Sequence, residues 1–180
     1  MAASLPTPVL ETERFVMRPL EAGDTVALFP TLSSGKHCRY MLRPPFETEE
    51  ALAAWLFDPG WDGRTWIAVD RTTGDVAARV VAVPTAPQIA EIGYITLAGR
   101  HGQGVAGECA ARLVDHLFAE EGHHRLSAGT DPRNLASNAV LARLGFTREA
   151  HLRESVKTHM GWCDEYLWGL LAKDWRERRA

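Results

Sequence analysis

The sequence predicts a mixed α/β fold with a mostly antiparallel central sheet and helices on both faces. Three consecutive strand patterns in the middle of the chain favour an antiparallel meander. Two helical patterns precede this meander, and two more follow it in alternation with strands, which favours crossover connections. With 180 residues, of which 46% are hydrophobic and 24% charged, the chain is expected to form one domain, residues 1–180.

The first part of the chain predicts one strand and two helices. Residues 14–18 alternate in polarity, as a strand does. Asp24 is expected to cap a helix that runs to about Leu32. Thr48 is expected to cap a second helix that continues through Phe57.

The meander follows. Residues 65–70 and 76–83 read as strands joined by the polar turn 71–75, which is a hairpin signal. Residues 89–97 form the third strand in the series. We therefore expect these three strands to lie side by side in one sheet.

The strongest helical pattern covers residues 108–121, and Gly122 ends it. Its apolar stripe comprises Ala110, Leu113, Val114, Leu117 and Phe118. A strand is expected at residues 125–130.

The last helix is expected to end at Gly145, and either Asn134 or Ser137 caps its start. Residues 146–154 and 165–171 predict two closing strands.

Composition and charge restrict the partners that we expect. The net charge of −3 and the pI near 6.2 give no basic footprint for nucleic acid. No apolar run approaches membrane-spanning length, and no signal-peptide pattern is visible. Three scattered cysteines without metal-ligand spacing indicate reduced thiols, no metal site and a cytoplasmic location.

The most informative segment is the glycine-rich stretch 100–108, between the third meander strand and the strongest helix. Gly102, Gly104 and Gly107 leave the backbone bare, so that a ligand can approach it closely. The following helix directs its free N–H groups and its positive dipole end at this loop. The sequence therefore predicts a phosphate-binding site here.

The same glycines spell G-x-G-x-x-G, and Asp131 lies about 20 residues downstream, as in dinucleotide-binding proteins. That fold places its glycine loop directly after its first strand and needs several βα units afterwards. In this chain, residues 98–101 separate strand from glycine, and the loop falls past the middle of the chain. A dinucleotide-binding oxidoreductase is therefore kept as an alternative only.

Four motifs in the same order resemble the GNAT superfamily of acyl-CoA-dependent N-acyltransferases. They are most similar to the branch that includes the ribosomal-protein N-terminal alanine acetyltransferases. The motifs are residues 11–20, residues 91–94 followed by 102–106, residues 131–138 running into 144–146, and residues 152–154 with 162–166.

The resemblance implies a GNAT-like fold and acetyl-CoA as co-substrate. It places the pyrophosphate on the backbone of His101, Gly102, Gln103, Gly104, Val105, Ala106 and Gly107. It places the pantetheine and thioester beside free backbone groups of Ile95, Thr96 and Leu97, where an N–H would stabilise the oxyanion. Many members have a tyrosine in the last helix as general acid, and this chain has Leu141 at that position.

An amine acceptor must lose a proton before it attacks, and a carboxylate can take this proton. Glu91 is at the family-like position, and Glu154 is the second candidate. Ser137 is the candidate hydrogen-bond donor to the leaving thiolate, and Asn134 the candidate contact to the pantetheine or sulfur. Helix capping explains both of these residues equally well.

The acceptor is expected over the two N-terminal helices. The aromatic and apolar candidates there are Tyr40, Met41, Trp55 and Trp61, unless they only pack in the core. Arg39 and Arg43 suit a carboxylate or phosphate on the acceptor, or are solvated charges.

These features predict an N-acetyltransferase that acts on a primary amine by direct attack in a ternary complex. The amine is a protein N-terminus or a small molecule, and a homodimer is possible. A non-catalytic acyl-CoA-binding module is the second alternative.

Overall fold

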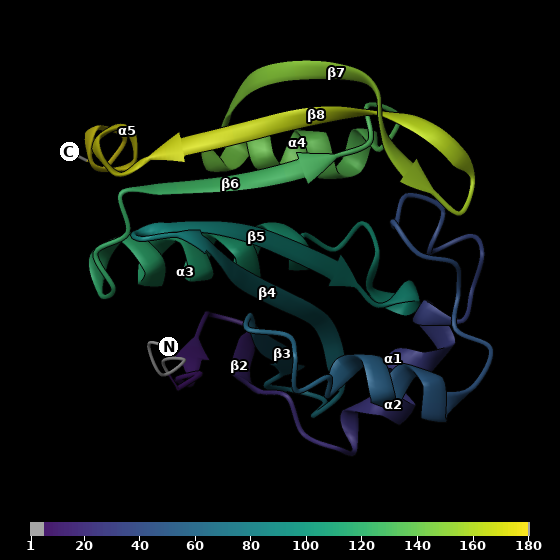
Figure 1. The fold of residues 1–180 in the computed structure, drawn as a ribbon. Coiled ribbons are helices and arrows are strands. Elements are labelled where there is room, and N and C mark those ends of the chain that lie inside the picture. The colour runs from purple at the N-terminus through teal and green to yellow at the C-terminus, as the bar shows by residue number, and fades with distance from the viewer. Residues whose placement is uncertain (1–5, 180) are drawn as a thin grey trace.

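A computed structural model describes residues 6–179 and confirms the predicted mixed α/β fold (Figure 1). Residues 1–5 and 180 of the predicted domain lie outside the described part. The strands are β1 (Leu10–Glu11), β2 (Phe15–Pro19), β3 (Arg64–Asp70), β4 (Val76–Ala86), β5 (Ile89–Thr96), β6 (Arg125–Thr130), β7 (Thr147–Thr158) and β8 (Gly161–Leu171). The helices are α1 (Asp24–Leu32), α2 (Glu49–Leu56), the 3-10 turn η1 (Ala98–Arg100), α3 (Val105–Ala119), α4 (Leu135–Leu144) and α5 (Ala172–Glu177).

The strands form one sheet in the order β1-β2-β3-β4-β5-β6-β8-β7. Within this sheet β5 and β6 pair in parallel, and the other neighbours pair antiparallel. The parallel pair follows from its connection, because α3 crosses over between β5 and β6.

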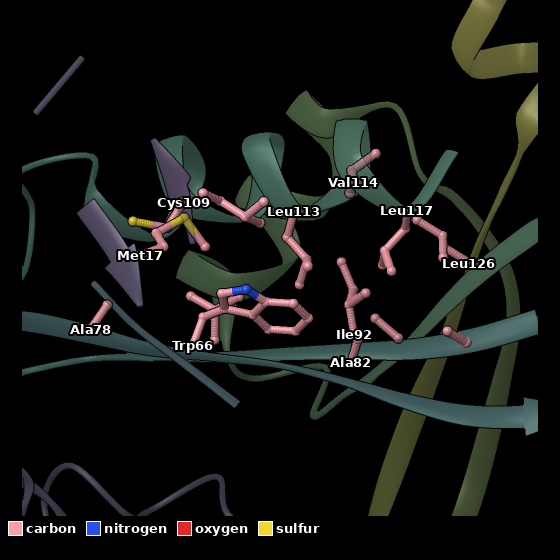
Figure 2. Packing of buried hydrophobic residues seen from close by; sticks show 14 of the residues in the cluster. Met17, Trp66, Ala78, Ala82, Ile92, Cys109, Leu113, Val114, Leu117 and Leu126 are labelled. Atoms are coloured by element: carbon pink, nitrogen blue, oxygen red, sulfur yellow. The ribbon is translucent and has the colours of Figure 1, made fainter. Parts of the chain in front are cut away.

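Helices α3 and α4 cover one face of the sheet, and α1 and α2 cover the other (Figure 1). The larger core lies under α3, where fully buried Leu113 points toward Trp66 of β3 and fully buried Leu117 lies beside Leu126 of β6 (Figure 2). The second core joins Leu28 of α1 and Leu52 of α2 to the opposite face. Side chains alternate between the two faces along each strand, and each face is therefore covered by its own pair of helices.

The largest differences from the predicted boundaries are in α3, β7 and β8. Helix α3 begins at Val105 rather than at residue 108, because Gly104 adopts a left-handed conformation and acts as its N-cap. The final strands extend to Thr158 and start at Gly161, which gives a much longer hairpin than expected. Strand β1 and helix α5 were not predicted.

The expected caps of α1 and α2 have different outcomes. Thr48 caps α2 as predicted, because its side chain accepts a hydrogen bond from the Ala51 N–H. The prediction for Asp24 is wrong, because Gly23 is the N-cap and the buried Asp24 carboxylate binds Arg18 at 2.7 and 2.8 Å.

None of the described helices is both long and apolar enough to cross a membrane.

Candidate active site

The central feature of the site is the divergence of β5 from β6. The two strands pair at three positions only, and the last pair is Glu91 with Ser127. Beyond it, β5 continues beside β4 to Thr96, and β6 continues beside β8 to Thr130. Figure 1 shows the two strands separating towards the ends of their arrows. The later residues of both strands therefore have backbone groups that no strand partner satisfies.

A cavity of about 390 Å³ lies at this divergence, and its lining comes from both faces of the sheet. From the sheet it is lined by Arg79, Val81, Ile92, Gly93, Tyr94, Ile95, Ala128, Gly129 and Thr130. From the helices and loops it is lined by Leu32, His37, Tyr40, Met41, Leu42, Trp55, Asp131, Asn134, Ser137 and Leu141. A space of this size suits the reactive end of one substrate together with a small second one.

The strand register decides which backbone groups of β5 face the divergence. The Leu97 N–H donates to the Ala77 carbonyl of β4 at 2.9 Å. Hydrogen-bonding direction alternates along an antiparallel strand, so Ile95 also directs its backbone groups at β4. Tyr94 and Thr96 direct theirs at the side of β6. Of the three predicted backbone contacts, Thr96 is therefore suitably oriented, Ile95 and Leu97 are not, and Tyr94 takes their place.

The glycine loop has the geometry of an anion cradle. Gly102 and Gly104 have φ angles of 74° and 75°, which favour glycine. The first hydrogen bond within α3 joins the Glu108 N–H to the Gly104 carbonyl, so the three preceding N–H groups, Val105 to Gly107, have no partner within the helix. A β-carbon at Gly102 or Gly107 would meet nothing within 4 Å. The backbone here is bare, rich in donors and open.

Side chains of the loop shape it rather than extend towards a ligand. The His101 Nε2 donates to the Thr96 carbonyl at 2.8 Å, and the Gln103 Nε2 donates to the Gly99 carbonyl at 3.1 Å. Arg14 fixes the loop to the start of β2, because its guanidinium binds the Gln103 carbonyl and the Glu108 carboxylate. The Val105 side chain is buried in the larger core. At these positions the backbone, and not the side chain, is therefore the candidate contact to a ligand.

Asn134 and Ser137 come together with a third residue at the start of α4. The Asn134 side chain caps the helix by accepting from the Ser137 N–H at 3.2 Å, which settles the choice of cap. The Tyr94 hydroxyl lies 2.9 Å from Ser137 Oγ and 3.2 Å from the Ser137 carbonyl oxygen. Burial raises the pKa of Tyr94 to about 12, so this hydroxyl keeps its proton at neutral pH. A tyrosine is thus present at the cavity, supplied by β5 instead of by position 141.

Two carboxylates lie next to residues of the cavity lining, although neither is itself a lining residue: Glu91 precedes Ile92, and Glu165 lies against Gly129. Glu91 directly precedes the lining residues Ile92 and Gly93 along β5, and its side chain is exposed. Desolvation by the surrounding protein still raises the pKa of Glu91. The pKa of Glu165 on β8 is also raised, by desolvation and then by the charge of Glu91. A β-carbon at Gly129 would lie 2.5 Å from Glu165 Oε1, so this glycine makes room for the second carboxylate.

Glu154 is not brought to this cavity. It lies in the irregular part of β7, with a φ of 45°, and its backbone N–H donates to Asp164. It lines a separate, shallow hollow with neighbouring residues of the β7–β8 hairpin. The role of Glu154 as a base stays a prediction, but its position gives it no support.

The predicted acceptor residues lie on the face that α1 and α2 cover. Tyr40, Met41 and Trp55 line the cavity, whereas Arg39 and Arg43 are not among its lining residues. The Arg43 guanidinium instead lies 3.3 Å from the centre of the Phe46 ring. Trp61 stacks on Arg79, which does line the cavity.

Sequence reasoning missed Tyr94, Glu165 and Arg79 as site residues. Strand alternation held a partial signal, because Glu91 and Tyr94 fall on opposite faces of one strand beside the glycine loop. The pairing of Tyr94 with Ser137 depends on a contact between residues 43 positions apart. Among residues 6–179, no group of three or more His, Cys, Asp or Glu side chains is arranged to hold a metal ion.

A family model described as an acetyltransferase (GNAT) domain matches residues 14–147. The chain belongs to the GNAT family of acetyltransferases. The dinucleotide-binding alternative is wrong, because a dinucleotide-binding sheet is mostly parallel and this GNAT sheet has one parallel pair among its described strands. GNAT proteins use acetyl-CoA, and the residues of the glycine loop fit the phosphates of such a molecule.

The curated relatives include a ribosomal-protein alanine N-acetyltransferase, as the prediction expected, and other N-acetyltransferases. The chain is 24% identical over 167 residues to the uncharacterized N-acetyltransferase YnaD of Bacillus subtilis, covering 92% of this chain and 98% of that one. It is 28% identical over 88 residues to the ribosomal protein uS5-alanine N-acetyltransferase of Escherichia coli, covering 49% and 45% respectively.

A solved structure shows the same fold. It is a spermidine N-acetyltransferase from Vibrio cholerae in complex with CoA and spermine. Its TM-score is 0.80 at 19% identity, and the match covers 92% of this chain and 99% of that chain.

Proposed function

We propose that this GNAT protein transfers the acetyl group of acetyl-CoA to a primary amine by direct attack in a ternary complex. The divergence of β5 from β6 carries the proposal, because it opens one cavity to both faces of the sheet. The glycine loop and the start of α4 serve the cofactor side, and α1 and α2 serve the acceptor side. The solved relative that holds both CoA and an amine supports this arrangement.

The chain offers donors for each part of the cofactor. The free N–H groups at the start of α3 suit the pyrophosphate, as helix N-termini generally suit anions. The backbone groups of Tyr94 and the N–H of Thr96, which face away from β4, suit the amides of the pantetheine, whereas the Thr96 carbonyl already accepts from His101. The Tyr94 N–H is then the candidate donor to the oxyanion that forms on the thioester carbonyl.

Glu91 is the proposed base. Its raised pKa brings it closer to neutrality, where a base works best, and it remains next to the cavity lining. Ser137 is the proposed donor to the leaving thiolate. The Tyr94 hydroxyl orients this serine through their shared contact and is a positioning residue.

The proposal is tested by following thiol release from acetyl-CoA with a panel of primary amines, with the acetylated product identified by mass spectrometry. We expect release that depends on both substrates. Binding of acetyl-CoA without turnover of any amine would favour the non-catalytic acyl-CoA module instead.

The contact between Tyr94 and Ser137 gives a kinetic prediction. Ser137→Ala should lower kcat about 10-fold, because a hydrogen bond to a charged group contributes about 1.5 kcal/mol or more. Tyr94→Phe should lower kcat about fivefold, the size of one ordinary hydrogen bond. The double variant should lose little more than Ser137→Ala alone, because the tyrosine acts through the serine. The measurement is kcat at saturating acetyl-CoA.

Tyr166→Phe is the matched control, since Tyr166 is not among the cavity-lining residues. Multiplicative losses in the double variant would show that the two hydroxyls act independently. A lower melting temperature with unaltered kcat would leave only a structural role for the pair.

A further inference from the structure

Arg79 of β4 is a charged side chain in the cavity wall, and no carboxylate of residues 6–179 is paired with it. Its one hydrogen bond within the described part of the chain goes from a terminal nitrogen to Thr65 Oγ1, at 3.2 Å. Its Nε is buried and has no hydrogen-bond partner among those residues. A guanidinium has five N–H donors, so most of the donors of Arg79 are unused.

Arg64 is another arginine with little exposed surface, and its charge is balanced by a carboxylate. Its guanidinium binds both oxygens of Glu121 at 2.6 Å, and both side chains are 11% exposed. Burying an ion without a partner costs several kcal/mol. Burial lowers the pKa of Arg79 to about 10, so it still carries its charge at neutral pH.

Two indole rings hold the guanidinium in place without using its N–H edge. Its central carbon lies 4.7 Å from the centre of the Trp55 ring and 5.5 Å from that of Trp61. Such contacts contribute about 0.5–2 kcal/mol and stabilise charge through the ring faces. A planar ligand can therefore still bind at the edge.

The position of Arg79 assigns it to the acceptor side. Arg79 pairs with Ile95 and lies on the face of α1 and α2, whereas the Tyr94–Ser137 pair lies on the opposite face. Glu91 lies four positions before Ile95, about 13 Å away along β5 at about 3.3 Å per residue. A cation and a carboxylate thus mark two separate points on one side of the sheet.

We propose that the acceptor is a small primary amine that also carries a carboxylate, and that Arg79 binds this carboxylate. The inference rests on the proposed acetyl transfer and narrows its substrate class. The forked edge of a guanidinium matches a carboxylate with two parallel hydrogen bonds. A second ammonium group at this point would meet a like charge, which disfavours polyamines.

The test compares matched amines that differ in one group. The panel contains straight-chain ω-amino acids of increasing length, alkylamines of the same lengths, and the corresponding diamines. We expect kcat/KM for the best amino acid to exceed that for its alkylamine and its diamine by about 10-fold or more, an effect of about 1.4 kcal/mol. A preference for diamines or for uncharged alkylamines would overturn the inference.

Variants of Arg79 then connect the preference to this residue. Arg79→Met should reduce the ratio of kcat/KM for the amino acid to kcat/KM for the alkylamine to about one. The change should come chiefly from a higher KM for the amino acid. Arg79→Lys should keep part of the ratio, because it retains the charge and loses the fork. Arg39→Met is the control, since this exposed arginine lies outside the cavity lining, and it should leave the ratio intact. Equal losses for all amines in Arg79→Met would contradict the inference.

A binding measurement separates this inference from the proposed function. N-acetylated ω-amino acids, titrated by calorimetry into the protein with CoA, should bind the wild type at least 10-fold more tightly than Arg79→Met. Such binding without turnover of any amine would overturn the proposed transfer and leave the carboxylate site standing. Equal or undetectable binding in both proteins would overturn the carboxylate site.

Discussion

Gly107→Asp should weaken acetyl-CoA binding about 30-fold or more and leave the fold intact. Gly107 lies in the first turn of α3, and a β-carbon there would meet nothing within 4 Å. A carboxylate about 4 Å from a phosphate would repel it by about 4 kcal/mol at the effective dielectric of a protein surface, and half of this corresponds to about 30-fold in Kd. An acidic residue in the first turn also favours the helix dipole, so the melting temperature should not fall. Calorimetric titration with acetyl-CoA measures the change.

This position gives a sharper test than Gly104, where the φ of 75° would strain any branched side chain and confuse misfolding with lost binding. Gly23→Asp is the matched control, because Gly23 also lies at a helix N-terminus with open space around its β-carbon. Normal binding of acetyl-CoA by Gly107→Asp would show that the phosphates do not lie on the start of α3.

Glu91→Gln should lower kcat/KM for the amine by roughly 10²-fold, the usual contribution of a general base. No side-chain hydrogen bond of Glu91 is found within residues 6–179, so the amide should be tolerated without loss of stability. The loss should occur in the chemical step, with the Kd for acetyl-CoA little changed. Steady-state kinetics at saturating acetyl-CoA, together with calorimetry, separates the two quantities.

The pH dependence of the wild type should identify the same group. Desolvation raises the pKa of Glu91, and a base works only in its ionised form. Activity is therefore present above this raised pKa and is lost as the pH falls through it. Glu91→Gln should remove this acidic limb of the kcat/KM profile and retain the rise that belongs to deprotonation of the amine.

Glu154→Gln is the control for this experiment, since it makes the same chemical change outside the cavity. It should leave the rate and the pH profile as they are in the wild type. A large loss in Glu154→Gln with a normal rate in Glu91→Gln would exchange the two assignments. Normal rates in both variants would show that water or the substrate itself takes the proton.

Much of the fold was predictable because its signals are local. The apolar stripe of α3, the turn between β3 and β4 and the cap at Thr48 each depend on residues a few positions apart. The boundary at Gly104 was missed because the glycine that ends the loop is also the cap of the helix. The bent hairpin of β7 and β8 was shortened in the prediction because its register shifts twice, which interrupts the alternation.

The bare backbone of the glycine loop was predictable for the same reason, since Gly102, Gly104 and Gly107 leave it open without any distant contact. The choice of Ile95 and Leu97 as free backbone groups failed because the sequence does not show which edge of a strand each residue faces. This direction is fixed by the register with β4.

By itself, the sequence determined the order of the elements, the family and the glycine cradle, because periodicity, caps and turns depend on near neighbours. Only the tertiary structure decided that β5 and β6 separate after Glu91 and Ser127 and so open the cavity. It also decided that the Tyr94 hydroxyl meets Ser137 and that, among the residues that the structure describes, Arg79 lacks a carboxylate partner such as Arg64 has. These features arise from contacts between residues tens of positions apart, whose geometry is set when the whole sheet packs between its two pairs of helices.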